Sequence, residues 1–164
     1  RDKMEFEYTH LFKKIKLGTT IWSPLFSGVL SGKYINAIPE GSRLDKFSDN
    51  AGVHYRNYMA KKDEWDKKLL AIKAIAERLG TTLPVLAIAW VIKNPDVSTC
   101  ILGTSRVEQL VENLKALDVL PLITNEVEDE IESILGNAPQ GDMDWLTFTR
   151  LSNRRTANIK GLDS

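Results

Sequence analysis

The sequence is poor in cysteine, the residue that most often marks a disulfide framework or a zinc site. One cysteine among 164 residues excludes an intramolecular disulfide and a cysteine-rich zinc cluster. Because Cys100 lies in an apolar segment, we expect a buried, unreactive thiol in a reducing compartment. The sequence predicts no metal site.

Net charge and long apolar runs are also missing. The 22 basic residues balance the 22 acidic ones, so no overall field favours nucleic acid or an anionic membrane. No apolar run approaches the roughly 20 residues that span a bilayer, and residues 1–7 lack the apolar core of a secretory signal. We expect a cytoplasmic protein without nucleic-acid partner or membrane insertion. The first residue is not methionine, so we expect a piece of a longer chain.

Apolar periodicity predicts an α/β protein rich in helices. Helices are expected at about 8–15, 63–79, 83–93 and 125–135, and after Ser105, with glycines 18, 80 and 136 as stop signals. Two short apolar segments, 19–22 and 97–102, are typical of strands, and each precedes a polar or glycine-bearing turn and a helix. That order is typical of a parallel sheet, but two strands are too few to make one. Either the core is helical, or the rest of the sheet lies elsewhere.

Residues 98–113 run from a strand through a glycine into an amphipathic helix. Ser105 and Glu108 have the spacing of a capping box, and the free NH groups of a helix start attract anions. Arg106 would oppose the helix dipole in the first turn, unless a bound anion lies between them. The alternative is a well-capped junction with an exposed arginine.

Residues 25–34 form a second loop that follows a strand, with two glycines, two serines and a lysine. Such a loop lets backbone NH groups approach a phosphate, although an ordinary connecting loop has the same composition. Residues 35–58 are polar and irregular, like a lid over a ligand, and Arg43 is the cation there best able to reach a phosphate. His10 and His54 are expected to be surface residues.

Three motifs resemble the aldo-keto reductase family. They are Trp22-Ser23-Pro24-Leu25 followed by Gly28, Gly32 and Lys33; residues 74–90, with Ala76-Glu77-Arg78-Leu79-Gly80; and Leu102-Gly103-x-Ser105 followed by Gln109, Glu112 and Asn113. The likeness covers residues 11–139. Within the family the sequence is similar to the β subunits of Shaker-type voltage-gated potassium channels.

The resemblance implies the C-terminal part of a (β/α)8 TIM barrel that holds NADP(H) at the carboxyl ends of its strands. Residues 1–139 would form this part, and residues 140–164 a polar, partly disordered extension. By the resemblance Trp22 would lie against the nicotinamide ring. The remaining implied cofactor contacts are Ser23, Pro24, Leu25, Phe26 and Ser27 along the pyrophosphate, Lys33 and Arg43 at the phosphates, and Gly103, Ser105, Arg106, Gln109, Glu112 and Asn113 at the adenosine end.

This sequence departs from the family pattern in three ways. Phe26 and Ser27 replace smaller residues of the channel subgroup, so only their backbone contacts carry over, and Gly41 replaces an aromatic residue. Nothing matches the catalytic aspartate, tyrosine, lysine and histidine of the family, which come from the first half of the barrel. Tyr34, Tyr55 and Tyr58 lack the accompanying lysine and histidine, so the chain alone is not expected to reduce carbonyls.

Two functions follow from the resemblance. The first is the NADP(H)-binding portion of an aldo-keto reductase that transfers hydride to a small aldehyde or ketone. The second is a redox-sensing β subunit that binds the cytoplasmic domain of a potassium channel, with a homotetramer implied by that subgroup. A helical module without cofactor is the third interpretation.

Overall fold

The computed structural model describes residues 1–46 and 53–139. The helices and strands, in chain order, are η1 (Asp2–Glu7), α1 (Thr9–Ile15), β1 (Thr19–Trp22), η2 (Phe26–Ser31), α2 (Arg43–Lys46), α3 (Val53–Ala60), α4 (Lys62–Arg78), α5 (Leu83–Lys93), β2 (Val97–Ile101), α6 (Val107–Leu114), α7 (Ala116–Val119), η3 (Leu120–Leu122) and α8 (Asn125–Leu135). The proposed extension at 140–164 lies outside the described residues.

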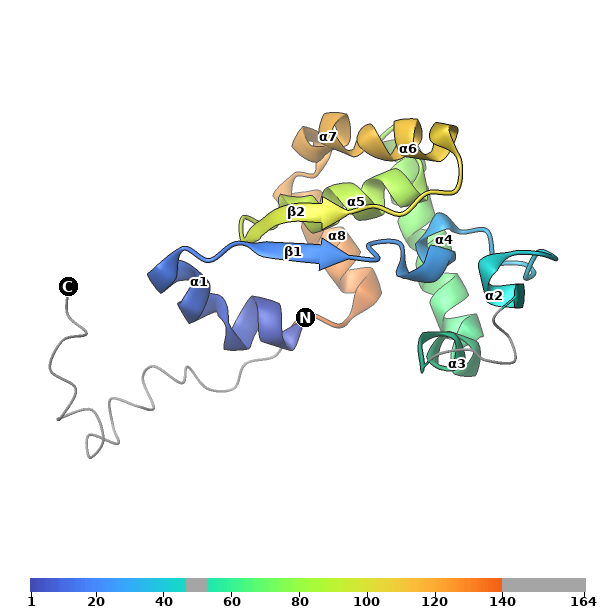
Figure 1. The fold of residues 1–164 in the computed structure, drawn as a ribbon, viewed down its shortest axis with the longest axis horizontal. Helices are drawn as coiled ribbons and strands as arrows, with labels where there is room; N and C mark the ends of the chain where they lie inside the picture. The colour runs from blue at the N-terminus through green and yellow to red at the C-terminus, as the bar shows by residue number, and fades with distance from the viewer. Residues whose placement is uncertain (47–52, 140–164) are drawn as a thin grey trace, which may run out of the picture.

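The two predicted strands form a parallel pair, which confirms the α/β prediction (Figure 1). Thr19 lies opposite Val97, and Trp22 lies opposite Ile101 at the other end of the ladder. Helix α5 packs against β2 on one face of this sheet. The sheet has two strands in the described part of the chain, so each strand has one edge with no strand beside it there.

Helix α5 is the centre of the hydrophobic core. Its buried side chains are Leu83, Val85, Leu86, Ile88 and Ala89. Neighbours lie on several sides of it, namely β2, α4, α6, α7 and η2, as an all-apolar helix requires. Thr82 is its N-cap residue, and Pro84 lies in its first turn, where proline is favoured.

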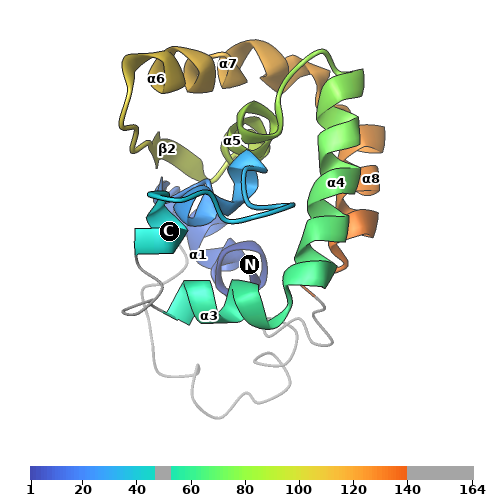
Figure 2. The ribbon, with the colours of Figure 1, turned by 90° about the vertical axis from the view of Figure 1, so that its right-hand side faces the viewer.

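Polar contacts join α8 to the helices beside it. Helix α4 lies alongside α8 (Figure 2), where Arg78 forms an ion pair with Glu130. Lys68 donates a hydrogen bond to the carbonyl of Leu135 at 2.9 Å. The predicted stop of α8 is confirmed, because Gly136 has a left-handed φ of 60°.

The N-terminal helix ends differently from the prediction. Lys16, with φ of 52°, is the left-handed residue that ends α1, so Gly18 is not its stop signal. Gly18 has another role, because a Cβ at this position would lie 1.8 Å from the hydroxyl oxygen of Ser98. Glycine at this position therefore leaves room for the Ser98 hydroxyl, which would have to rotate if a larger residue stood here.

The segment 35–58 is not irregular throughout, as the sequence led us to expect. Helix α2 begins at Arg43 and helix α3 spans Val53–Ala60. Helix α3 has no continuous apolar stripe, so the spacing of its apolar residues did not predict a helix.

Helix α6 carries the predicted apolar stripe, but the stripe is exposed. Its members are Val107, Leu110, Val111 and Leu114, and Leu117 of α7 continues it. The opposite side of α6, with the buried Asn113, faces the rest of the chain, and α6 and α7 lie over one side of α5 (Figures 1 and 2). The apolar side of this helix is therefore uncovered within the described residues.

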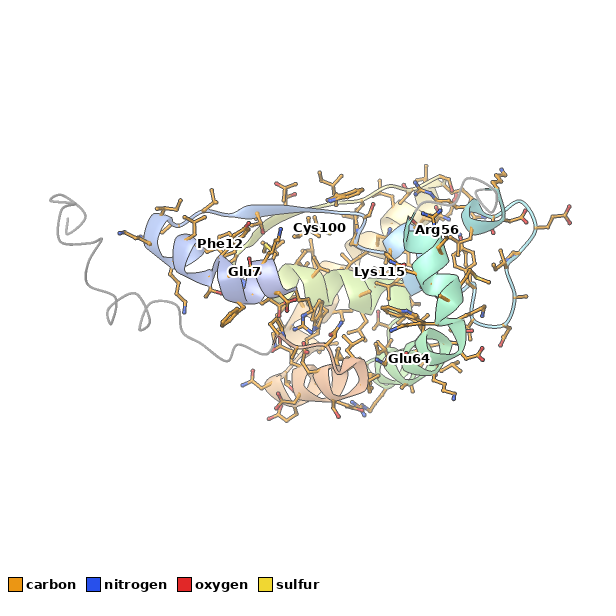
Figure 3. All side chains as sticks on the ribbon, turned by 90° about the horizontal axis from the view of Figure 1, so that it is seen from below. Glu7, Phe12, Arg56, Glu64, Cys100 and Lys115 are labelled. Atoms are coloured by element: carbon orange, nitrogen blue, oxygen red, sulfur yellow. The ribbon has the colours of Figure 1, made fainter. Side chains whose placement is uncertain are left out.

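Cys100 is less buried than predicted. The thiol lies in β2, where Figure 3 labels it beside α5, and it keeps an intermediate exposure. Burial raises the pKa of the Cys100 thiol above its ordinary value, so the thiol stays protonated at neutral pH.

In the residues described, no single helix is long and apolar enough to cross a membrane. Helices α4 and α5 have the length and composition of a membrane span only when taken together, and they are bent by 88° at their junction.

Candidate functional site

The two loops that the sequence singles out leave the sheet at the same edge. Trp22 ends β1 and lies in register with Ile101, which ends β2. Residues 23–34 follow the first strand and residues 102–106 follow the second, both at carboxyl ends (Figure 1). Carboxyl ends of parallel strands are where α/β proteins bind ligands. The Trp22 side chain is 72% exposed at this edge.

The loop after β1 has an uncommon backbone conformation. Ser23, Phe26 and Ser27 have φ values of 54°, 46° and 57°, and Gly28 continues the left-handed run at 91°. A non-glycine residue in this region costs free energy, on the order of 1–3 kcal/mol, and such residues cluster at functional sites. The amides of Phe26 and Gly28 donate to the carbonyls of Ser23 and Leu25, both at 2.9 Å. The loop is therefore a tight turn held by its own hydrogen bonds.

Lys33 and Tyr34 return against Gly28. A Cβ on Gly28 would lie 3.4 Å from the Lys33 Nζ and 3.4 Å from the Tyr34 hydroxyl oxygen. The Lys33 ammonium lies 4.9 Å from the centroid of the Tyr34 ring, a cation–π contact. The Tyr34 side chain is fully buried, and its hydroxyl has no hydrogen-bond partner among the described residues.

The unpartnered Tyr34 hydroxyl leads to a stability prediction. Tyr34→Phe is expected to leave the free energy of unfolding unchanged or to raise it by up to about 2 kcal/mol, because it removes a buried polar group without a partner. The matched control is Tyr58→Phe, which removes a hydroxyl that donates to Asp66 Oδ1 at 2.8 Å. Urea unfolding of both variants checks this. A loss in Tyr34→Phe as large as in Tyr58→Phe would contradict it.

The predicted capping box is wrong. Arg106 has extended backbone angles (φ −143°, ψ 147°) and is the N-cap of α6, so the helix begins one residue later than expected. Instead, Gln109 Oε1 accepts the Ser105 backbone NH at 3.1 Å and lies 3.2 Å from the Ser105 hydroxyl oxygen. The Gln109 side chain thus accepts the hydrogen bond from the Ser105 backbone NH that the capping box assigns to Glu108.

The other predicted residues near α6 differ in their environment. Asn113 is buried, whereas Gly103 and Arg106 are exposed. Glu112 Oε1 accepts a hydrogen bond from the Thr82 hydroxyl at 2.9 Å, which ties α6 to the start of α5. Pro24 and Leu25 are half-buried in the first loop.

Two arginines provide unpaired positive charge on the surface. Arg43 on α2 and Arg106 before α6 are both exposed, and neither forms an ion pair with a described residue. Guanidinium groups that lack a carboxylate partner remain available to a phosphate. A tight glycine turn with an ammonium and two exposed guanidinium groups are donor types that bind phosphates, and the exposed Trp22 indole is a surface on which a planar ring can stack. The residues are therefore compatible with a nicotinamide dinucleotide.

A groove of about 600 Å³ lies at the other end of the sheet, and it contains none of the predicted cofactor residues. Its walls include Trp90, Lys93 and the residues that precede β2, together with Arg1. The Arg1 guanidinium stacks on Trp90 at 5.1 Å and pairs with Glu5 and Glu132, so its charge is compensated.

Two of the tyrosines considered in the sequence analysis lie in the core. Tyr34 and Tyr58 are fully buried. Side-chain positions of His10, His54 and Tyr55 lie outside the described part of the molecule. Among residues 1–46 and 53–139, no group of three or more histidine, cysteine, aspartate or glutamate side chains is arranged to hold a metal ion.

Sequence reasoning missed a polar cluster beneath the first loop. Lys62 on α4 donates to the carbonyl of Ile35 at 2.8 Å and pairs with Asp66, and Tyr58 donates to the same carboxylate. The Lys62–Asp66 spacing of four residues on one helix face was a visible signal. Their contacts with α3 and with the loop depend on the tertiary fold, which periodicity does not report.

Comparison with known proteins identifies the class. The model of the aldo/keto reductase family matches residues 5–135, and the chain belongs to this family. A relative from Oryza sativa subsp. japonica, named probable voltage-gated potassium channel subunit beta, is 44% identical over 143 residues. The match covers 85% of this chain but 42% of the relative, so the chain spans less than half the length of that relative.

Proposed function

We propose that this chain is the NADP(H)-binding portion of an aldo-keto reductase. The observation that carries the proposal is the common edge at which Trp22 and the loop before α6 leave the sheet. In that role Trp22 borders the nicotinamide, residues 23–27 follow the pyrophosphate with Lys33 and Arg43, and Gly103, Ser105, Arg106, Gln109, Glu112 and Asn113 hold the adenosine end. The bound NADPH supplies a hydride for a small aldehyde or ketone in the complete protein.

The chain's own residues contribute binding and orientation rather than proton transfer. Trp22 is an aromatic surface on which a planar ring stacks, and the cations compensate phosphate charge. The chain contains no counterpart of the family's catalytic tetrad, so reduction requires residues from outside it. Family membership and the edge geometry support this division of roles.

Nucleotide binding is the direct test. We expect NADPH to quench the tryptophan fluorescence of the full chain, because the exposed Trp22 indole would become covered. Trp22→Phe should abolish most of this quenching while Trp65 and Trp90 still report on the fold. Equal signals in the two proteins, or no quenching at saturating NADPH, would refute the proposal.

A second candidate function is a cytoplasmic, redox-sensing β subunit of a voltage-gated potassium channel. The specific support is the 44% identity with the rice relative of that name. In this role the protein binds NADP(H), contacts the cytoplasmic domain of the channel and assembles as a homotetramer. Co-purification of the complete protein with that domain, and slow turnover of aldehydes, would distinguish a sensor from a metabolic reductase.

A further inference from the structure

The three side chains of the cluster beneath the first loop, Tyr58, Lys62 and Asp66, form one connected network. Tyr58 is fully buried on α3, and its hydroxyl donates to Asp66 Oδ1 at 2.8 Å. The Lys62 ammonium pairs with the other carboxylate oxygen of Asp66 and lies 5.8 Å from the centroid of the Tyr58 ring. The network therefore joins the end of α3 to the first turn of α4.

The network also reaches the backbone that leaves the first loop. Lys62 Nζ donates to the carbonyl of Ile35 at 2.8 Å, and the Tyr58 hydroxyl lies 3.4 Å from the carbonyl of Tyr34. Both carbonyls belong to the two residues that directly follow Lys33. The helix pair thus holds the chain at the position from which the Lys33 side chain turns back over Gly28.

The chemistry of the network favours a fixed geometry. A largely buried ion pair is tolerated when further hydrogen bonds satisfy its atoms, and here the phenol and a backbone carbonyl do so. Burial and the hydrogen bond to Asp66 raise the pKa of Tyr58, so its hydroxyl remains a neutral donor. A satisfied polar network of this kind restrains the orientation of every group in it.

We propose that Lys62, Asp66 and Tyr58 are positioning residues for Lys33. They hold residues 34–35 from below, so that the Lys33 ammonium stays beside Gly28, where the dinucleotide pyrophosphate is expected. The inference rests on the proposed function, because it assigns these residues to the same cofactor site. None of the three touches the nucleotide, and each acts through the backbone next to Lys33.

The main experiment compares two ligands in the full chain. NADPH spans the whole site, whereas 2′-AMP carries only the adenosine and the 2′-phosphate and does not reach Lys33. We expect Lys62→Met to weaken NADPH binding about tenfold, the size of one lost charge-assisted contact, with 2′-AMP affinity within about twofold. Lys67→Met, an exposed lysine on the same helix, is the matched control and should change neither.

Three further comparisons separate positioning from a purely structural role. Tyr58→Phe keeps the ring and should fold even if Lys62→Met does not, and it should weaken NADPH binding selectively. Lys62→Arg keeps the positive charge and should restore the NADPH binding that Lys62→Met loses. In a Lys33→Met background, Lys62→Met should add no further loss, because the two substitutions remove the same interaction.

The outcomes are distinct. If the unsubstituted chain does not bind NADPH, the proposed function fails. If it binds NADPH but Lys62→Met and Tyr58→Phe bind it normally, or lose 2′-AMP to the same degree, the positioning role is overturned and the network serves only to join α3 to α4. Additive losses in the Lys33→Met background would overturn it as well.

Discussion

Leu86→Ala should lower the free energy of unfolding by about 2–5 kcal/mol. Leu86 is 1% exposed on α5, which contacts more elements of the fold than any other described helix. Truncation removes apolar contacts and leaves a cavity that the surrounding helices and sheet fill only in part. Domains are stable by about 5–15 kcal/mol, so this single change removes a large fraction of the total.

Leu70→Ala is the matched control for this prediction. Leu70 lies on α4 and is 51% exposed, so the same truncation removes little buried surface there. We expect its effect to stay within about 0.5 kcal/mol. Urea unfolding followed by tryptophan fluorescence measures both variants, and comparable losses would mean that α5 is not the centre of the core.

Arg106→Leu should reduce the preference for NADPH over NADH about 10- to 100-fold. The guanidinium is exposed directly before α6 and has no ion-pair partner among the described residues, so it is available for the 2′-phosphate that NADH lacks. Charge-assisted hydrogen bonds of this kind contribute about 1.5–3 kcal/mol each. The ratio of the two dissociation constants, measured by fluorescence titration, reports the change.

Two features make the Arg106 test specific. The Arg106 side chain makes no capping hydrogen bond, so its loss should not unfold α6. Lys115→Leu removes an exposed cation at the other end of the same helix and should leave the ratio unchanged. A ratio that falls equally in both variants would point to general electrostatic attraction instead of a specific phosphate contact.

The sequence predicts those parts of the fold where local rules decide the conformation. Helices α4 and α8 have clear apolar periodicity, α5 is a continuous apolar segment, and glycine or threonine marks their boundaries; the structure confirms all three. The parallel pairing of β1 with β2 followed from the order of elements. Helix α3 was missed because its side chains show no periodic stripe, and its position depends on the contact of Tyr58 with α4.

At the site, the structure bears only on where the two loops begin. The loops after Trp22 and Ile101 leave the sheet at the same edge, because these two residues end neighbouring parallel strands. The capping box failed because Ser105 and Glu108 have the right spacing, but the extended backbone at Arg106 moves the helix start by one residue. Spacing alone does not register such a shift. The cofactor assignments themselves remain predictions.

The uncovered side of α6 has a consequence for handling the isolated chain. Val107, Val111 and Leu114 are exposed there, and the outer edge of each strand has no strand beside it in the described residues. Free backbone groups and bare aliphatic surface together invite intermolecular sheet growth. The purified polypeptide should therefore be kept dilute, and light scattering should accompany every titration, since clumping would mimic a spectroscopic response to nucleotide.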